Sequence, residues 1–205
     1  MPDISLTDFV DFAIKAGPAQ LTKVRELARR GDYDPRCDFW KPLRECIQDS
    51  HAKKRKLEDA LLGLKDPKKL KRYPLAVRAY KKFVGKKAIG WFEPPFAIWT
   101  YDGLNVRVNP ELGLNINGKK FAVKLYFKDD KPTEARLRVV FEMMRLTLNL
   151  DPDVTPAVLD VAKSHLLPAK SPDDGLAAAL EAQAKAFVHM WNAMHAKSVV
   201  QAAVA

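Results

Sequence analysis

The sequence of 205 residues has few of the residues that mark redox, zinc and hydrolase sites. Its two cysteines, Cys37 and Cys46, are too few for a disulfide framework and lack the CxxC spacing. The four histidines show no zinc-binding spacing, and no glycine-rich phosphate loop or GxSxG motif is present. We therefore expect two thiols in a reducing, cytoplasmic environment, and we expect neither a nucleotide loop nor a serine hydrolase.

Long apolar runs are also missing. No run approaches the 18 apolar residues that would indicate a membrane span. The first residues, MPDISLTDFVDFAIKAG, carry three aspartates and lack the basic region of a secretory signal. The sequence is 47% hydrophobic and 29% charged, which suits one large domain or one domain with an appendage. We expect no membrane partner.

Basic residues, by contrast, are abundant and concentrated. Residues 51–90 hold 14 basic and three acidic side chains, a net charge of +11, whereas the rest of the chain sums to −1. The net charge of +10 therefore comes entirely from this segment. Clustered cations of this kind are typical of proteins that neutralise the phosphates of nucleic acid. The alternatives are anionic lipid, an acidic protein partner, or a helix face that is merely solvated.

We call residues 51–87 the Lys-rich ribbon. It contains many lysines and few arginines, so it suits phosphate contacts better than base readout, which favours bidentate arginine. The candidate nucleic-acid-binding residues are Lys53, Lys54, Arg55, Lys56, Lys68, Lys69, Lys71, Arg72, Lys81, Lys82, Lys86 and Lys87.

Apolar spacing divides the chain into two regions. Residues 1–72 are expected to form a helical region that ends in a basic connector, and residues 73–205 an α/β core with a C-terminal helix. The fold class is therefore α/β (α+β), in which a small mixed sheet in αβββαβ order is flanked by helices. The expected elements include helices at 39–64, 74–84, 134–146 and 173–197, and strands at 88–93, 96–102, 104–116, 119–128 and 156–162.

Asn117-Gly118 predicts a β-hairpin, because both positions of a type I′ turn need a positive φ angle. Pairing the flanking strands about this turn makes one face of the hairpin almost entirely apolar. The polar face then brings Glu111 opposite Lys124. Pro110 cannot donate to the ladder, so a bulge there could shift the pairs beyond it.

The element order and this hairpin resemble the core of the PD-(D/E)XK nuclease-like superfamily over about residues 74–167. In that family, an acid on the second strand and an acid-X-Lys motif on the third converge on Mg²⁺. Metal and lysine together activate water for phosphodiester cleavage. The resemblance implies that Glu111 is the second-strand acid and Lys124 the motif lysine. Ala122 occupies the place of the second acid, and one carboxylate alone holds Mg²⁺ poorly.

A displaced carboxylate would have to complete such a site. Asp102, before the second strand, is the first candidate for a catalytic and metal-binding partner of Glu111, followed by Glu142 and Asp160. The simpler interpretation is a cross-strand ion pair between Glu111 and Lys124, worth about 0.2–1 kcal/mol.

A group of aromatic residues precedes the hairpin. These side chains could stack on bases beside a basic groove, or they could pack inside the core. They are Trp91, Phe92, Phe96, Trp99 and Tyr101.

Three functions remain open from the sequence. The first prediction is a sequence-tolerant nucleic-acid-binding protein that uses the Lys-rich ribbon beside the α/β core. The second is a Mg²⁺-dependent nuclease built on Glu111, Lys124 and a displaced acid. The third is an interaction or regulatory module whose basic segment binds an acidic protein.

Overall fold

The computed structural model describes residues 1–30 and 38–203, with side chains through residue 194; Cys37 lies outside this part. The helices are α1 (Leu6–Ala13), α2 (Pro18–Arg30), α3 (Lys41–Ala52), η2 (Leu57–Leu61, a 3₁₀ turn), α4 (Pro67–Val84), α5 (Glu134–Thr147) and α6 (Leu176–Ala203). The strands are β1 (Asp3–Ser5), β2 (Ile89–Phe92), β3 (Ala97–Tyr101), β4 (Leu104–Val108), β5 (Leu112–Ile116), β6 (Lys119–Tyr126), β7 (Val154–Asp160) and β8 (His165–Pro168).

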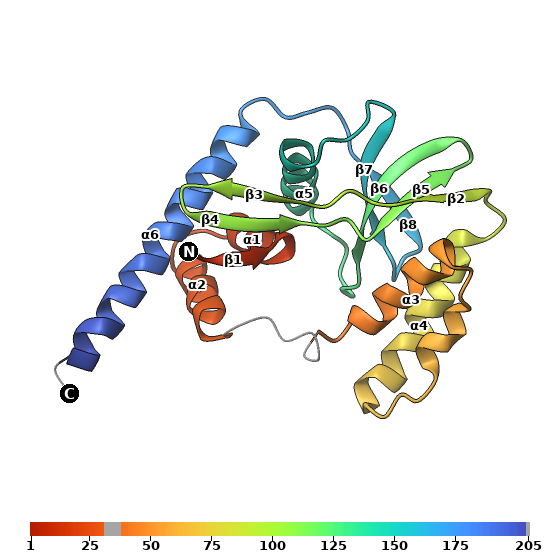
Figure 1. Cartoon of the computed structure of the whole chain (residues 1–205), viewed down its shortest axis with the longest axis horizontal. Coiled ribbons are helices and arrows are strands. Elements are labelled where there is room, and N and C mark those ends of the chain that lie inside the picture. The colour runs from red at the N-terminus through yellow and green to blue at the C-terminus, as the bar shows by residue number, and fades with distance from the viewer. Residues whose placement is uncertain (31–37, 204–205) are drawn as a thin grey trace.

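The strands form two sheets, and the expected α/β class is confirmed. The larger sheet has the order β2-β5-β6-β7-β8 and is mixed, because β6 and β7 are parallel and joined by α5, while its other pairs are antiparallel. The order α4, β2, β5, β6, α5, β7 follows the predicted αβββαβ pattern, with the β3–β4 hairpin inserted after β2. That hairpin and β1 form a separate three-stranded sheet (Figure 1).

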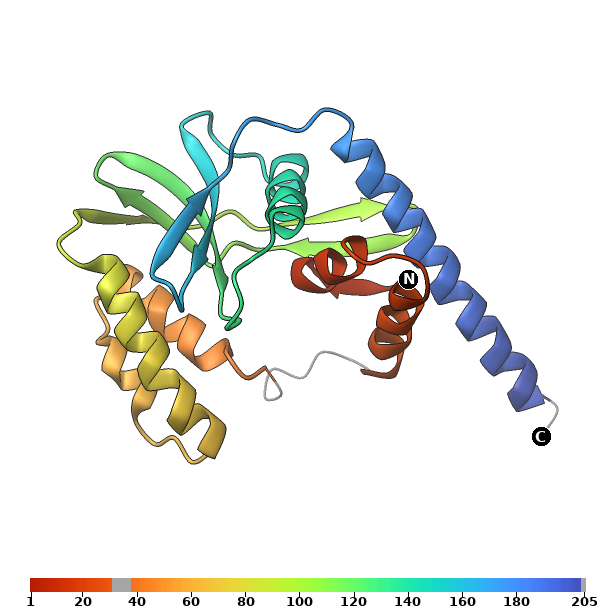
Figure 2. The ribbon, with the colours of Figure 1, turned by 180° about the vertical axis from the view of Figure 1, so that it is seen from behind.

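Helices cover both faces of the five-stranded sheet (Figure 1; Figure 2 shows it from behind). On one face, Ile47 of α3 and Tyr80 of α4 lie in the same buried cluster as Leu114 of β5. On the other, Met143 of α5 lies in a second buried cluster with Ala122 of β6. The sheet is therefore buried on both sides.

The N-terminal region is mostly helical, as expected, but it also supplies a strand. β1 pairs in parallel with β4, so the first residues belong to the same sheet as the β3–β4 hairpin. The predicted boundary between residues 72 and 73 lies inside α4, which continues unbroken from Pro67 to Val84.

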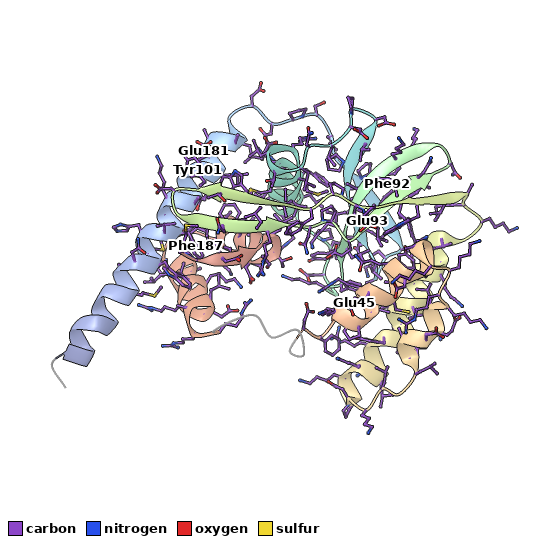
Figure 3. The ribbon with its side chains drawn as sticks, in the orientation of Figure 1. Glu45, Phe92, Glu93, Tyr101, Glu181 and Phe187 are labelled. Atoms are coloured by element: carbon purple, nitrogen blue, oxygen red, sulfur yellow. The ribbon has the colours of Figure 1, made fainter. Side chains whose placement is uncertain are left out.

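The long C-terminal helix α6 crosses the second cluster and then extends away from the body of the protein (Figures 1 and 2). Phe187 of α6 packs edge-on against Phe12 of α1, with ring centroids 5.1 Å apart. Figure 3 labels Phe187 and also Tyr101, which lies where the end of β3 meets α6. Among the described residues, no helix is both long and apolar enough to cross a membrane.

The predicted hairpin register is confirmed near the turn. Asn117 and Gly118 have φ angles of 51° and 86°, and the pairing runs without a shift back to Leu112 opposite Val123. The prediction that this strand continues back to residue 104 is wrong, because β4 belongs to the other sheet. The two strands are separated by a short segment that contains Pro110. Directly after Pro110, the N–H of Glu111 donates to the carbonyl of Val123, and the regular ladder between β5 and β6 begins at Leu112.

Two helix predictions also need correction. The helix expected over 39–64 ends at Ala52, because the polar segment HAKKRK offers no apolar face to bury; Lys54 there has a φ of 56°. The helix expected from residue 74 begins instead at Pro67, because Asp66 accepts the N–H groups of Lys68 and Lys69 as an N-cap.

His51 of α3 makes a partly buried contact that predicts a pH effect on stability. Its Nε2 lies 2.7 Å from the hydroxyl of Tyr80, and burial lowers the pKa of His51 below 6.5. As the pH falls below about 6.5, the unfolded chain takes up a proton that the folded His51 resists, so the free energy of unfolding decreases. Urea titrations between about pH 7.5 and about pH 5.5 should show a smaller decrease for His51→Gln than for the wild type. Equal decreases would contradict this prediction.

Candidate nucleic-acid interface

The structure brings Glu111 and Lys124 together in a closed ion pair. The Lys124 ammonium donates to Oε1 of Glu111 at 2.6 Å and to the carbonyl of Asn109 at 3.0 Å. The second carboxylate oxygen of Glu111 accepts the N–H of Leu125 at 2.8 Å. The two charged side chains are only 9% and 14% exposed. Both carboxylate oxygens of Glu111 therefore already have partners within the protein.

Helix α3 adds two further contacts to Glu111. Nε of Arg44 lies 3.8 Å from the Glu111 carboxylate, and Arg44 also binds Asp38 at 2.5 Å. The side-chain amide of Gln48 donates to the Glu111 carbonyl at 2.8 Å. These contacts attach α3 to the start of β5, so Glu111 lies at a junction between two layers of the fold.

The acids expected to complete a metal site lie elsewhere. Asp102 is exposed in the turn between β3 and β4, at the opposite end of β4 from Glu111. It is there because Asp102 and Gly103, with φ angles of 47° and 85°, form a second type I′ turn. Figure 1 shows this hairpin turn beside α6. Asp160 accepts the N–H of Lys163, and Glu142 pairs with Arg145.

The donor set around Glu111 does not fit Mg²⁺. Within residues 1–30 and 38–194, no three His, Cys, Asp or Glu side chains lie close enough together to hold a metal ion. Ala122, at the position of the missing acid, is fully buried. The arrangement supports the interpretation of Glu111 and Lys124 as an ion pair, now with an added role in joining α3 to the sheet.

Part of the charge of the Lys-rich ribbon already has partners within the protein, mostly in exposed ion pairs. Lys53 pairs with Asp49 at 2.9 Å, and Arg72 pairs with Asp129 at 2.8 Å. Arg55 contacts Asp49 and Asp59, and Lys81 contacts Glu58. Lys69 and Lys87 lie over the rings of Phe39 and Phe83. These six cations are less available to an external partner than the others of the ribbon.

The outer face of α4 carries a row of free cations. Residues 68, 71, 75, 78 and 82 recur at alternating spacings of three and four, which places them on one side of the helix. We call this row the α4 stripe: Lys68, Lys71, Leu75, Arg78 and Lys82, all exposed. None of its four cations forms an ion pair with a described residue, and Leu75 is 59% exposed.

The candidate nucleic-acid-binding residues predicted from the sequence omit Arg78, although helical spacing alone places it in the row. At 1.5 Å per residue, the α4 stripe spans roughly 21 Å from Lys68 to Lys82. Lys86 follows the end of α4 and is also exposed and without an ion pair among the described residues. Lys54, Lys56 and Lys65, which lie outside α4, are likewise exposed and without an ion pair among the described residues. The α4 stripe therefore holds part of the free charge of the ribbon, arranged in one regular row.

A pocket of about 420 Å³ opens at the N-terminal end of the α4 stripe. Its aromatic side chains come from the turn before α3 and from the end of β6, and charged side chains complete its rim. The lining residues are Phe39, Trp40, Phe127, Lys68, Arg72, Lys128, Asp129 and Asp130. Lys68 belongs to both the stripe and the pocket, so the two features are continuous.

The aromatic residues singled out in the sequence serve mainly in packing. Trp99 stacks on Tyr101 with ring centroids 5.5 Å apart, and Trp91 stacks on His51. The pocket instead uses rings from residues 39, 40 and 127, whose distance in sequence hides their proximity.

No family model matches the chain, and no curated protein is significantly similar to it.

Proposed function

We propose that this protein binds nucleic acid through phosphate contacts made by the α4 stripe. The observation that carries the proposal is the row Lys68, Lys71, Arg78 and Lys82, exposed on one face of α4 without ion pairs to the described residues. Cations that have no protein partner gain most from phosphate, because binding releases the counterions condensed on the polyanion.

The composition of the row favours a sequence-tolerant mode of binding. Three of its four cations are lysines, which act as point charges and do not form the bidentate contacts by which arginine reads guanine. A helix face roughly 21 Å long can follow several consecutive phosphates. The metal-dependent nuclease receives no support from the Glu111 site, since its carboxylate is held by Lys124 and Leu125.

Neutralising the stripe tests the proposal. The variant Lys68→Gln/Lys71→Gln/Arg78→Gln/Lys82→Gln keeps good helix formers in α4 and removes four charges. We expect its affinity for a labelled oligonucleotide to fall by about thirtyfold or more at low salt. The slope of log affinity against log salt should become shallower by about 3 to 4, or roughly one for each lost phosphate contact. Fluorescence anisotropy over a salt series measures both quantities.

A matched control removes the same number of charges away from α4. Four exposed cations outside the Lys-rich ribbon serve for this, namely Lys15, Arg25, Arg29 and Lys170, each changed to Gln. Their loss should change affinity by only about threefold, through the general field of the protein. Equal losses in the two variants, or unchanged binding by the α4 variant, would contradict the proposal. A partner that survives nuclease treatment and depends on the stripe would instead identify an acidic protein.

A further inference from the structure

The pocket beside Lys68 contains a stack of rings that reaches the surface. Trp40 is nearly parallel to Tyr73, with centroids 5.5 Å apart, and nearly parallel to Phe127 on its other side, at 4.6 Å. Tyr73 is fully buried, whereas Phe127 is half-buried and lines the pocket. The stack therefore begins in the core and has its outermost ring at the pocket.

Charged side chains of both signs surround this outermost ring. Lys68, Arg72 and Lys128 line the same pocket as Phe127, and so do Asp129 and Asp130. Lys128 also lies 3.5 Å from the carboxylate of Asp11. Arg72 is bound to Asp129, but both side chains are well exposed, so water and salt weaken that pair. The three cations outnumber the two carboxylates, so the pocket combines a flat apolar surface with a rim of net positive charge. These two features together suit a nucleobase next to its phosphate.

We propose that this pocket accepts an unpaired base, so that the preferred ligand is single-stranded nucleic acid whose backbone follows the α4 stripe. This inference rests on the proposed function. A base in a duplex has both faces covered by its neighbours, and only an unpaired base can stack on a protein ring. The base continues the stack on Phe127, while its phosphates contact Lys128 and Lys68 at the pocket and then the remaining cations of the helix.

The dimensions agree with such an occupant. A volume of about 420 Å³ lies in the range of small-molecule sites, and it is large enough for one nucleotide and water. The pocket is at one end of the row of cations, so a strand can insert one base and continue along α4 without bending back. Stacking on a phenyl ring is tolerant of base identity, in keeping with the lysine-rich stripe.

The test compares a 20-nucleotide oligothymidine with a 20-base-pair duplex, both labelled, against wild type and Phe127→Leu. We expect the wild type to bind the single strand more tightly than the duplex. Phe127→Leu should weaken single-strand binding by about tenfold and change duplex binding by less than about twofold. The matched control is Phe96→Leu, the same substitution at an exposed phenylalanine before β3, and it should change neither affinity.

A second variant guards against damage to the fold, since Phe127 also supports Trp40. Lys128→Gln leaves the ring stack intact and should weaken single-strand binding by about threefold, again sparing the duplex. Tighter duplex binding by the wild type, or equal losses on both ligands in both pocket variants, would overturn the pocket assignment and leave the α4 stripe untouched. If the wild type binds neither ligand, the proposed function falls together with the pocket.

Discussion

Replacing Glu111 with alanine is expected to lower the free energy of unfolding by about 3 to 5 kcal/mol. The substitution leaves the Lys124 ammonium, 14% exposed, without its carboxylate, and leaves the N–H of Leu125 without an acceptor. It also removes the anion that faces Arg44 of α3. Urea unfolding followed by circular dichroism measures the loss directly, and it should be many times that of an exposed ion pair.

The matched control for this prediction removes both charges at once. A buried ion pair can be exchanged for apolar side chains of similar volume at little cost, because the desolvation penalty disappears together with the attraction. We therefore expect Glu111→Leu combined with Lys124→Met to recover most of the stability that Glu111→Ala loses. If Glu111→Ala unfolds like the wild type, the pair is not the junction between α3 and β5 that its contacts indicate.

The same substitutions separate the ion pair from a catalytic role. Mg²⁺- or Mn²⁺-dependent cleavage that is present in the wild type and absent in a folded Lys124→Met variant would restore the nuclease prediction. Equal cleavage by both proteins would identify a contaminating nuclease. Since the Glu111 carboxylate already accepts two hydrogen bonds within the protein, we expect no cleavage that depends on Lys124.

Local signals in the sequence were sufficient for the hairpin and for the Glu111–Lys124 pair. Asn117-Gly118 defines the turn, and a period of two then fixes which residues face each other. Asp102-Gly103 is a turn signal of the same kind, and in the structure Asp102 forms the turn of another hairpin, so its prediction as a metal ligand is not supported. The prediction of one strand over 104–116 hides this second hairpin, because the chain passes from one sheet to the other near Pro110.

The interface itself depends on tertiary contacts that spacing cannot supply. Arg72 and Asp129 are 57 residues apart, and only the folded chain shows that they are paired. The pocket likewise brings together Trp40 and Phe127, which are far apart in the sequence, with their ring centroids 4.6 Å apart. The charge count places the net positive charge within residues 51–90, but only the structure distinguishes the cations with ion pairs from those without.

Gly113→Ala is expected to destabilise the protein by about 3 kcal/mol, because the five-stranded sheet has no room for a methyl group there. A Cβ atom at Gly113 would lie 2.2 Å from the carbonyl oxygen of Phe92 and 2.7 Å from its ring. Phe92 belongs to β2, directly opposite Gly113 in the ladder, and is labelled in Figure 3. The clash involves backbone, so relief requires β2 to move away from β5.

Gly90→Ala supplies the control, because Gly90 lies in the same β2–β5 ladder and its added Cβ would meet Asn115 at an ordinary 3.4 Å. We expect this change to alter stability by less than about 1 kcal/mol, since alanine also restricts the unfolded chain. Similar losses for the two variants in urea titrations would show that β2 can shift at little cost. A selective loss at Gly113 would show that β2 is rigidly held against β5. Helix α4, which bears the α4 stripe, connects to β2 through Gly85, so a rigid β2 also fixes the C-terminal end of α4.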